Sequence, residues 1–208
     1  MAAAYQTLLI PDNVIPGLSL QLPRVTRRSA DWFYHFCQVN GDLQFEQNAN
    51  GEIIVMAPAG FESGDRELEA ARQLGNWARR EGSGRANGPN AGFRLPNGAT
   101  RAADASWTLK SRLKKLTPSE RQKFPLLCPD FVIEVASPSD RLPKLREKME
   151  EYLANGVRLG WLIDSRQRNV YVYRPGKKVQ VRSNPRQISG SPELPGFVLK
   201  LAEVWEPF

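Results

Sequence analysis

The predicted fold depends most on one segment, which reads Cys128-Pro129-Asp130-Phe131-Val132-Ile133-Glu134-Val135-Ala136-Ser137. In a strand, alternate side chains share a face, so Phe131, Ile133 and Val135 lie on one side. Val132, Glu134 and Ala136 lie on the other side. A glutamate between apolar neighbours has to be paired, protonated or bound to a cation, because burying a bare charge is costly. We therefore predict a buried strand that carries one carboxylate, Glu134.

A second carboxylate, Asp104, lies in a similar setting earlier in the chain. The residues 92–95 and 100–109 are expected to form a hairpin around Asn97-Gly98, a strong signal for a tight turn. Asp104 and Ser106 then share one face of the second strand. Two strand carboxylates with a nearby lysine are the parts of a metal-dependent phosphodiesterase site, because a cation polarises the phosphoryl oxygen and activates water.

A long helix is predicted over residues 62–80, and Glu67 is a candidate site residue on it. At 100° per residue, Glu67 falls inside the apolar arc of this helix, whereas Glu69 falls well outside it. A glutamate on the buried stripe of a helix is unusual. The arc expected to face the core comprises Leu68, Ala71, Leu74, Gly75 and Ala78.

The order of the remaining elements predicts an α/β protein with a mixed sheet and helices on its faces. Residues 1–28 are Pro-rich and irregular, and residues 29–208 are expected to form a single domain. We predict a short helix near 29–37, strands at 43–46 and 52–56, a helix near 141–155, strands at 159–164 and 170–174, and a C-terminal helix near 201–205.

Composition excludes several classes of site. The one histidine, His35, rules out histidine-rich zinc sites and argues against a His-based triad. Cys37 and Cys128 show no metal-ligand spacing, and we interpret them as reduced core residues of a cytoplasmic protein. There is no apolar run of the roughly 18 residues needed to span a bilayer, and no signal peptide.

The charge of +7, from 29 Lys and Arg against 22 Asp and Glu, favours a polyanionic partner such as DNA. The alternative is that the excess only keeps the protein soluble. Residues 110–123 form the most basic segment. They either contact the phosphate backbone of DNA or are a solvated insertion.

The arrangement of these residues resembles the core of the PD-(D/E)XK nuclease superfamily, in which an Asp is followed by Glu-x-Lys on the next strand. More narrowly, the chain is similar to the Uma-two group of restriction-endonuclease-like proteins from about residue 30 to 180. Four motifs in the correct order carry this resemblance, together with the strand at 51–58: Arg101-Ala102-Ala103-Asp104-Ala105-Ser106-Trp107, Pro129-Asp130-Phe131-Val132-Ile133-Glu134-Val135, Lys148-Met149-Glu150-Glu151-Tyr152 with Asn155-Gly156-Val157, and Gly160-Trp161-Leu162-Ile163-Asp164.

One departure from the superfamily pattern concerns the lysine. Its position, two residues after Glu134, is occupied by Ala136, and Lys148 on the following helix looks like the replacement. Lys144 is the competing candidate. Asp130 is excluded from the site, because it lies roughly 13 Å along the strand from Glu134 at about 3.3 Å per residue.

The resemblance implies a Mg²⁺- or Mn²⁺-dependent DNA endonuclease. Asp104 and Glu134 would hold the metal, Lys148 would assist the nucleophile, and Glu67 would add a ligand or orient water. Cutting both strands needs two sites, which favours a homodimer. The alternatives are a nucleic-acid-binding module with catalysis lost, for which Ala136 is the main argument, and a hydrolase of another phosphate ester. Structural interpretations of single residues also remain open: Glu134 as an ion-pair partner of Lys148 or Arg146, and Lys148 as a surface residue.

Overall fold

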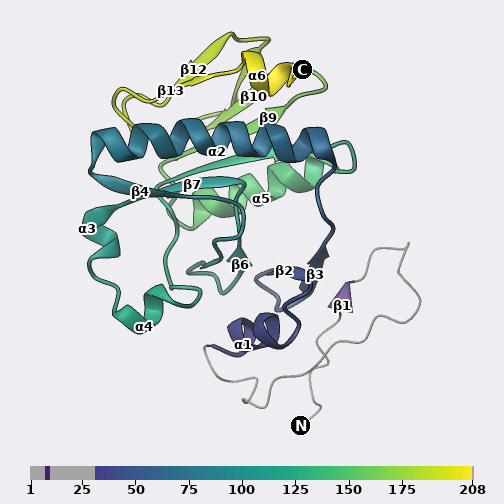
Figure 1. The fold of residues 1–208 in the computed structure, drawn as a ribbon, viewed down its shortest axis with the longest axis vertical. Coiled ribbons are helices and arrows are strands. Elements are labelled where there is room, and N and C mark those ends of the chain that lie inside the picture. The colour runs from purple at the N-terminus through teal and green to yellow at the C-terminus, as the bar shows by residue number, and fades with distance from the viewer. Residues whose placement is uncertain (1–7, 10–30, 208) are drawn as a thin grey trace.

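The structure is a computed structural model that describes residues 8–9 and 31–207 of the chain. These residues form two β-sheets and a two-stranded ladder, with helices against the sheets (Figure 1). The α/β class with a mixed sheet flanked by helices is therefore confirmed. The segment 1–28, predicted as irregular, lies outside the described residues apart from Leu8–Leu9, which form strand β1.

The larger sheet has six strands in the order β11-β10-β9-β8-β7-β4. Strands β8 and β9 are parallel and are connected through helix α5, while the other neighbouring pairs are antiparallel. The side chains of β8 are buried on both faces of the sheet, because each face packs into a hydrophobic core. The elements are β4 (Gly84–Asn87), β7 (Ala105–Leu109), β8 (Phe131–Ala136), α5 (Leu142–Ala154), β9 (Leu159–Asp164), β10 (Asn169–Tyr173) and β11 (Gln180–Ser183).

Two helices cover opposite faces of this sheet. Helix α2 (Phe61–Glu81) shares a core with Phe131, Ile133 and Val135, whereas Val132 belongs to a second core with Met149 of α5. The predicted alternation along β8 is confirmed. Glu134 therefore emerges on the face that α5 covers, where its neighbours along the strand are Val132 and Ala136.

The smaller sheet has the strand order β1-β3-β2-β6-β5 and carries helix α1 on it. The predicted second strand of the hairpin, residues 100–109, is corrected. Its first part is β6 in the smaller sheet, its last part is β7 in the larger sheet, and the chain bends at 102–104 to pass between them. Asp104 thus lies in the bend directly before β7. The bounds are α1 (Trp32–Val39), β2 (Gln44–Gln47), β3 (Ile53–Met56), β5 (Phe93–Arg94) and β6 (Thr100–Arg101).

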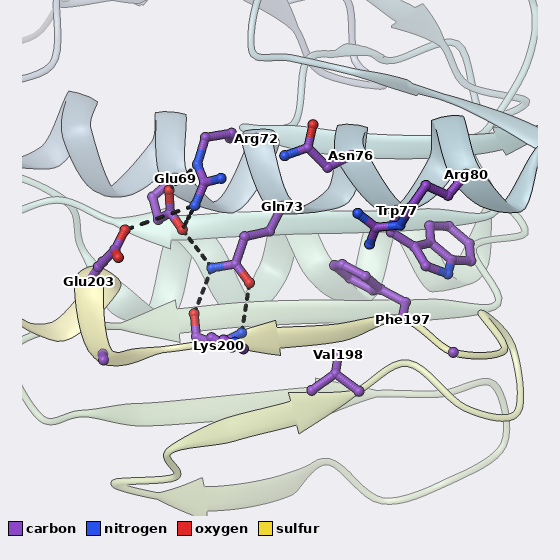
Figure 2. Close-up of a pocket in the computed structure, with 12 residues that line it drawn as sticks. Glu69, Arg72, Gln73, Asn76, Trp77, Arg80, Phe197, Val198, Lys200 and Glu203 are labelled. Atoms are coloured by element: carbon purple, nitrogen blue, oxygen red, sulfur yellow. Dashed lines mark hydrogen bonds and ion pairs between the residues drawn. The ribbon is translucent and has the colours of Figure 1, made fainter.

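The C-terminal elements cover a second side of α2 and correct the predicted burial of that helix. Strand β13 (Val198–Lys200) and helix α6 (Ala202–Trp205) lie against it, and β12 (Gln187–Ser189) pairs with β13. Glu69 is only 8% exposed, whereas Leu68, expected in the core, is 65% exposed. Figure 2 shows why Glu69 tolerates burial: Arg72 and Gln73 both donate to its carboxylate, and Gln73 also bonds the backbone of Lys200.

The insertion between β7 and β8 contains two short helices, α3 (Lys110–Leu113) and α4 (Pro118–Arg121). The second begins with a capping box, in which the Thr117 hydroxyl accepts from the Glu120 backbone and the Glu120 carboxylate accepts from the Thr117 backbone. In Figure 1 both helices lie below α2 at the left of the view, with α3 beside β4.

Candidate active site

Asp104 and Glu134 meet where the chain enters the larger sheet. Strands β7 and β8 pair antiparallel with Ala105 opposite Ile133, and continuing this register by one residue puts Asp104 opposite Glu134. Opposite residues of an antiparallel pair share a face, with Cβ atoms about 4.5–5.5 Å apart. The Asp104 carboxylate also accepts a hydrogen bond of 2.6 Å from the Val135 backbone, which fixes the bend beside Glu134. The two acidic residues singled out from the sequence are thus neighbours.

Lys148 reaches the same point from α5. Its Nζ lies 2.9 Å from Oε1 of Glu134 and 3.0 Å from Oε2, and it donates to the backbone carbonyl of Ala102 at 3.1 Å. The lysine side chain is 11% exposed, so its stem is enclosed by protein. Lys144, one turn earlier, is exposed. The structure therefore places Lys148, and not Lys144, beside the carboxylates.

The electrostatics around the two carboxylates favour a cation. Burial raises the pKa of Asp104 to about 7. The Lys148 ammonium lowers this pKa, and the charge of Glu67 raises it. Burial likewise raises the pKa of Glu134 to about 8, with Lys148 opposing and the Asp104 and Glu46 charges contributing. A single ammonium cannot compensate this many neighbouring carboxylates. The site therefore carries an excess of acidic groups that a bound cation would relieve.

Glu67 lies half-buried on α2, close enough to the other acidic groups for their charges to affect it. Burial raises its pKa, and the charges of Asp140 and Glu134 raise it further. Within residues 8–9 and 31–207, however, no three His, Cys, Asp or Glu side chains lie close enough together to ligate one ion. Glu67 thus borders the pair formed by Asp104 and Glu134 without completing a three-ligand set.

The residues present nevertheless fit a hard cation such as Mg²⁺. Oε1 of Glu134 is buried and accepts no hydrogen bond from the described residues, although the ammonium of Lys148 lies nearby. Mg²⁺ prefers oxygen ligands and is usually bound through one or two carboxylates, with water and phosphate completing its coordination. Asp104 retains partial exposure, which leaves an approach from solvent. Asp104 and Glu134 are the side chains that would hold such an ion.

Sequence reasoning missed two residues of this cluster, Glu46 on β2 and Arg101 on β6. Glu46 lies 2.9 Å from Nζ of Lys148, accepts from the Ala102 backbone at 3.0 Å, and pairs with Arg101 at 3.0 Å. Its side chain is 6% exposed. The strand at 43–46 was predicted, but alternation alone could not show that Glu46 points into the seam between two sheets.

Two other residues considered from the sequence lie in different settings. Asp130 is buried and binds Arg112 at 3.0 Å and the Leu109 backbone at 2.9 Å, so its carboxylate stabilises the start of α3. Arg146, an alternative partner for Glu134, instead stacks over the Tyr171 ring. A groove between α2 and the C-terminal layer (Figure 2) is lined by none of the four predicted site residues.

The mixed sheet between two helices is a restriction-endonuclease-like fold, with Asp104 directly before β7 and Glu134 on β8. The chain matches the model of the Uma2 family, described as "Putative restriction endonuclease", over residues 30–202. The chain therefore belongs to this family, and the resemblance found from its motifs is confirmed.

A solved structure supports the same fold. The chain is similar to a crystal structure described as "a putative nuclease belonging to DUF820" from Anabaena variabilis ATCC 29413, with a TM-score of 0.66 and 22% sequence identity. The match covers 77% of this chain and 89% of that one. A search among curated proteins gave no match. No helix in the described part of the chain is long and apolar enough to cross a membrane.

Proposed function

We propose that this protein is a metal-dependent DNA endonuclease of the PD-(D/E)XK type. Membership in a restriction-endonuclease family supports a nuclease function in general. The observation that carries the specific proposal is the meeting of Asp104, Glu134 and Lys148 at one point, although they come from a bend, a strand and a helix. Mg²⁺, or Mn²⁺ in its place, would polarise the phosphodiester and lower the pKa of the attacking water.

The protein groups have separate tasks in this proposal. Asp104 and Glu134 hold the cation, and the Val135 backbone orients the Asp104 carboxylate. The Lys148 ammonium positions the nucleophile and offsets the charge that develops on the phosphate. Glu67, on the opposite helix, orients water or supplies a further oxygen. Such an enzyme would cut both strands as a homodimer with two sites, and the two free cysteines suit a cytoplasmic location.

The test is cleavage of supercoiled plasmid DNA with Mn²⁺, with the Glu134→Gln variant run alongside. The proposal expects nicked or linear product from the parent protein and none from the variant, because the amide removes a ligand charge while keeping the shape. Cleavage that is unaffected by Glu134→Gln would refute the proposed site. Parallel assays on small phosphodiesters distinguish a DNA nuclease from a hydrolase of other phosphate esters.

A binding module without catalysis is the second candidate, and Ala136 favours it because the strand lysine is missing. Calorimetric titration with Mn²⁺ separates the two. A nuclease should bind the ion in a manner that depends on both Asp104 and Glu134, whereas a binding module should retain DNA affinity with no such ion site.

A further inference from the structure

The ammonium of Lys148 is shared by acceptors from three elements. It contacts Glu134 on β8, the carbonyl of Ala102 in the bend, and Glu46 on β2. An ammonium group has three N–H donors and no acceptor. In this arrangement Nζ donates to Ala102 and Glu134 and forms an ion pair with Glu46 at 2.9 Å, so these protein oxygens can engage all three donors.

Cation binding changes this balance. A metal ion held by Glu134 would attract the same carboxylate oxygens that Lys148 contacts and would repel the ammonium. The acceptors that remain are the Ala102 carbonyl and Glu46, and only Glu46 carries a negative charge. Lys148 stays beside the site, with one N–H available for a substrate or water oxygen, only if Glu46 retains it.

Glu46 is suited to this task because it is itself fixed. The Ala102 backbone donates to its Oε1 at 3.0 Å, and Nη1 of Arg101 lies 3.0 Å from its Oε2. Arg101 is held in turn by Glu151, whose carboxylate lies 2.6 Å from the guanidinium Nε. Burial alone would raise the pKa of Glu46, but Lys148 and Arg101 outweigh it and hold the pKa below its usual range.

We propose that Glu46 is a positioning residue that retains the Lys148 ammonium beside the cation site when the oxygens of Glu134 become metal ligands. The inference rests on the proposed nuclease function and adds a residue to it from the smaller sheet. Glu46 touches neither the cation nor the substrate, and it acts through Lys148. This assignment distinguishes Glu46 from Glu151, which binds the same Arg101 and does not contact Lys148.

The experiment compares Glu46→Gln with Glu151→Gln, each in the parent protein and in a Lys148→Met background. Both single substitutions remove one carboxylate charge from Arg101, so the loss of an ion pair with Arg101 is common to both. Three quantities are measured for each protein: thermal stability, Mn²⁺ affinity by calorimetry, and kcat and KM for plasmid cleavage. The calorimetric measurement requires no turnover, so it reports on variants that do not cleave.

We expect Glu46→Gln to lower kcat about 10- to 100-fold with little change in KM, the range seen when an outer-sphere partner is removed. Mn²⁺ binding should weaken as well. Without the Glu46 charge, Glu134 is the one carboxylate that still pairs with Lys148, so the ammonium competes with the ion for the oxygens of Glu134. In the Lys148→Met background the same substitution should change neither quantity further. Glu151→Gln should lower stability and should change kcat and Mn²⁺ affinity much less than Glu46→Gln does, because the direct contact between Glu46 and Lys148 remains.

Two outcomes would show that Glu46 is only structural. One is that Glu46→Gln and Glu151→Gln change kcat and Mn²⁺ affinity equally. The other is that Glu46→Gln has its full effect on kcat in the Lys148→Met background. If Glu46→Gln does not fold, Glu46→Asp replaces it, because the shorter side chain keeps a charge near Arg101 and withdraws it from Lys148. The inference then requires that the effect of Glu46→Asp on kcat disappears in the Lys148→Met background. A parent protein that neither cleaves DNA nor binds Mn²⁺ overturns the proposed function and this inference together. A parent that cleaves, with no coupling between Glu46 and Lys148, overturns the inference alone.

Discussion

Lys148 is the side chain whose removal most directly tests the chemistry. Lys148→Met keeps an apolar stem for packing but removes the ammonium, so we expect kcat to fall about 100-fold or more, as when one charge-stabilising donor is lost. DNA affinity should stay close to that of the parent protein. The assay is single-turnover cleavage of labelled duplex DNA under saturating protein.

Lys144→Met is the matched control, because Lys144 lies on the same helix and is exposed. It should cleave like the parent protein. Introducing Ala136→Lys into the Lys148→Met variant should restore part of the activity, since position 136 ends the strand that carries Glu134. Full activity of Lys148→Met, or loss of activity in Lys144→Met, would show that the wrong lysine has been assigned.

How far single residues could be predicted depends on how local their signals are. Glu134 is conspicuous because it interrupts an apolar strand, and Lys148 could be assigned through the family resemblance. Glu46 lies in a strand, Gln44–Gln47, in which Phe45 is the one apolar residue, and its partners come from distant parts of the chain. Its burial therefore follows from tertiary contacts that a local pattern does not encode.

At the level of elements, strand β4 illustrates what the pattern missed. Gly84-Arg85-Ala86-Asn87 has no apolar alternation and contains residues that are uncommon in strands, so it was not predicted. The strand exists because it pairs with β7 along its whole length. Similarly, Glu69 was placed outside the core because helical periodicity describes one buried face, whereas the C-terminal layer buries a second one.

Gly84 offers a stability test of that pairing. A Cβ at this position would lie 2.2 Å from the Trp107 ring, which is itself packed in the core. We expect Gly84→Ala to lower the free energy of unfolding by about 1–3 kcal/mol, the usual cost of overpacking. Urea denaturation followed by tryptophan fluorescence measures it.

The control is Gly75→Ala, within α2, where an added Cβ meets no atom within 4 Å. This substitution should raise stability by roughly 0.5–1 kcal/mol, because alanine restricts the unfolded chain more than glycine does. If both substitutions changed the free energy of unfolding in the same direction, the close contact between Gly84 and Trp107 would not be what determines the effect at position 84.

The basic insertion between β7 and β8 is the element expected to contact the DNA backbone. Lys114 and Lys115 are exposed, whereas Arg112 and Lys123 form ion pairs with Asp130 and Asp31. Replacing both exposed lysines by Ala should weaken duplex binding for all sequences. The slope of log K against the logarithm of the salt concentration should become less negative by about 1 per lysine. Fluorescence anisotropy over a salt series measures the slope.

Lys177 and Lys178 provide a control with the same change of charge, because both are exposed and lie between β10 and β11. Their replacement by Ala should leave the slope nearly unchanged. An unaltered slope for the Lys114 and Lys115 double variant would mean that this insertion does not meet phosphate.

For the whole molecule, the raised pKa values predict how stability depends on pH. The pKa of Asp104 is about 7 and that of Glu134 about 8, both above their usual values near 4, so the folded protein retains protons that the unfolded chain has released. Their stabilising contribution is complete below the unfolded pKa and is lost as pH rises through the folded one. Metal-free stability should therefore fall between about pH 4 and pH 8, by up to about 1.4 kcal/mol per pH unit for each proton.

Mg²⁺ should reverse this trend, because it binds the ionised carboxylates and competes with protons at lower pH. The increase in Tm caused by Mg²⁺ is expected to be larger at pH 8.5 than at pH 6. Asp104→Asn should flatten the metal-free pH dependence and reduce the effect of the ion. Scanning calorimetry provides both measurements, and a Tm that rises with pH in the metal-free protein would contradict the assigned pKa values.

The position of the site at the seam between two sheets bears on how the protein is made. Arg101 and Glu46 are separated by 55 residues and Lys148 and Ala102 by 46, so each contact closes a long loop of chain. A ribosome that has synthesised the chain only as far as β8 has supplied both acidic groups but not the lysine of α5. If the proposed function holds, the nascent protein would have no assembled cleavage centre until α5 has also been synthesised and has packed beside the seam between the two sheets.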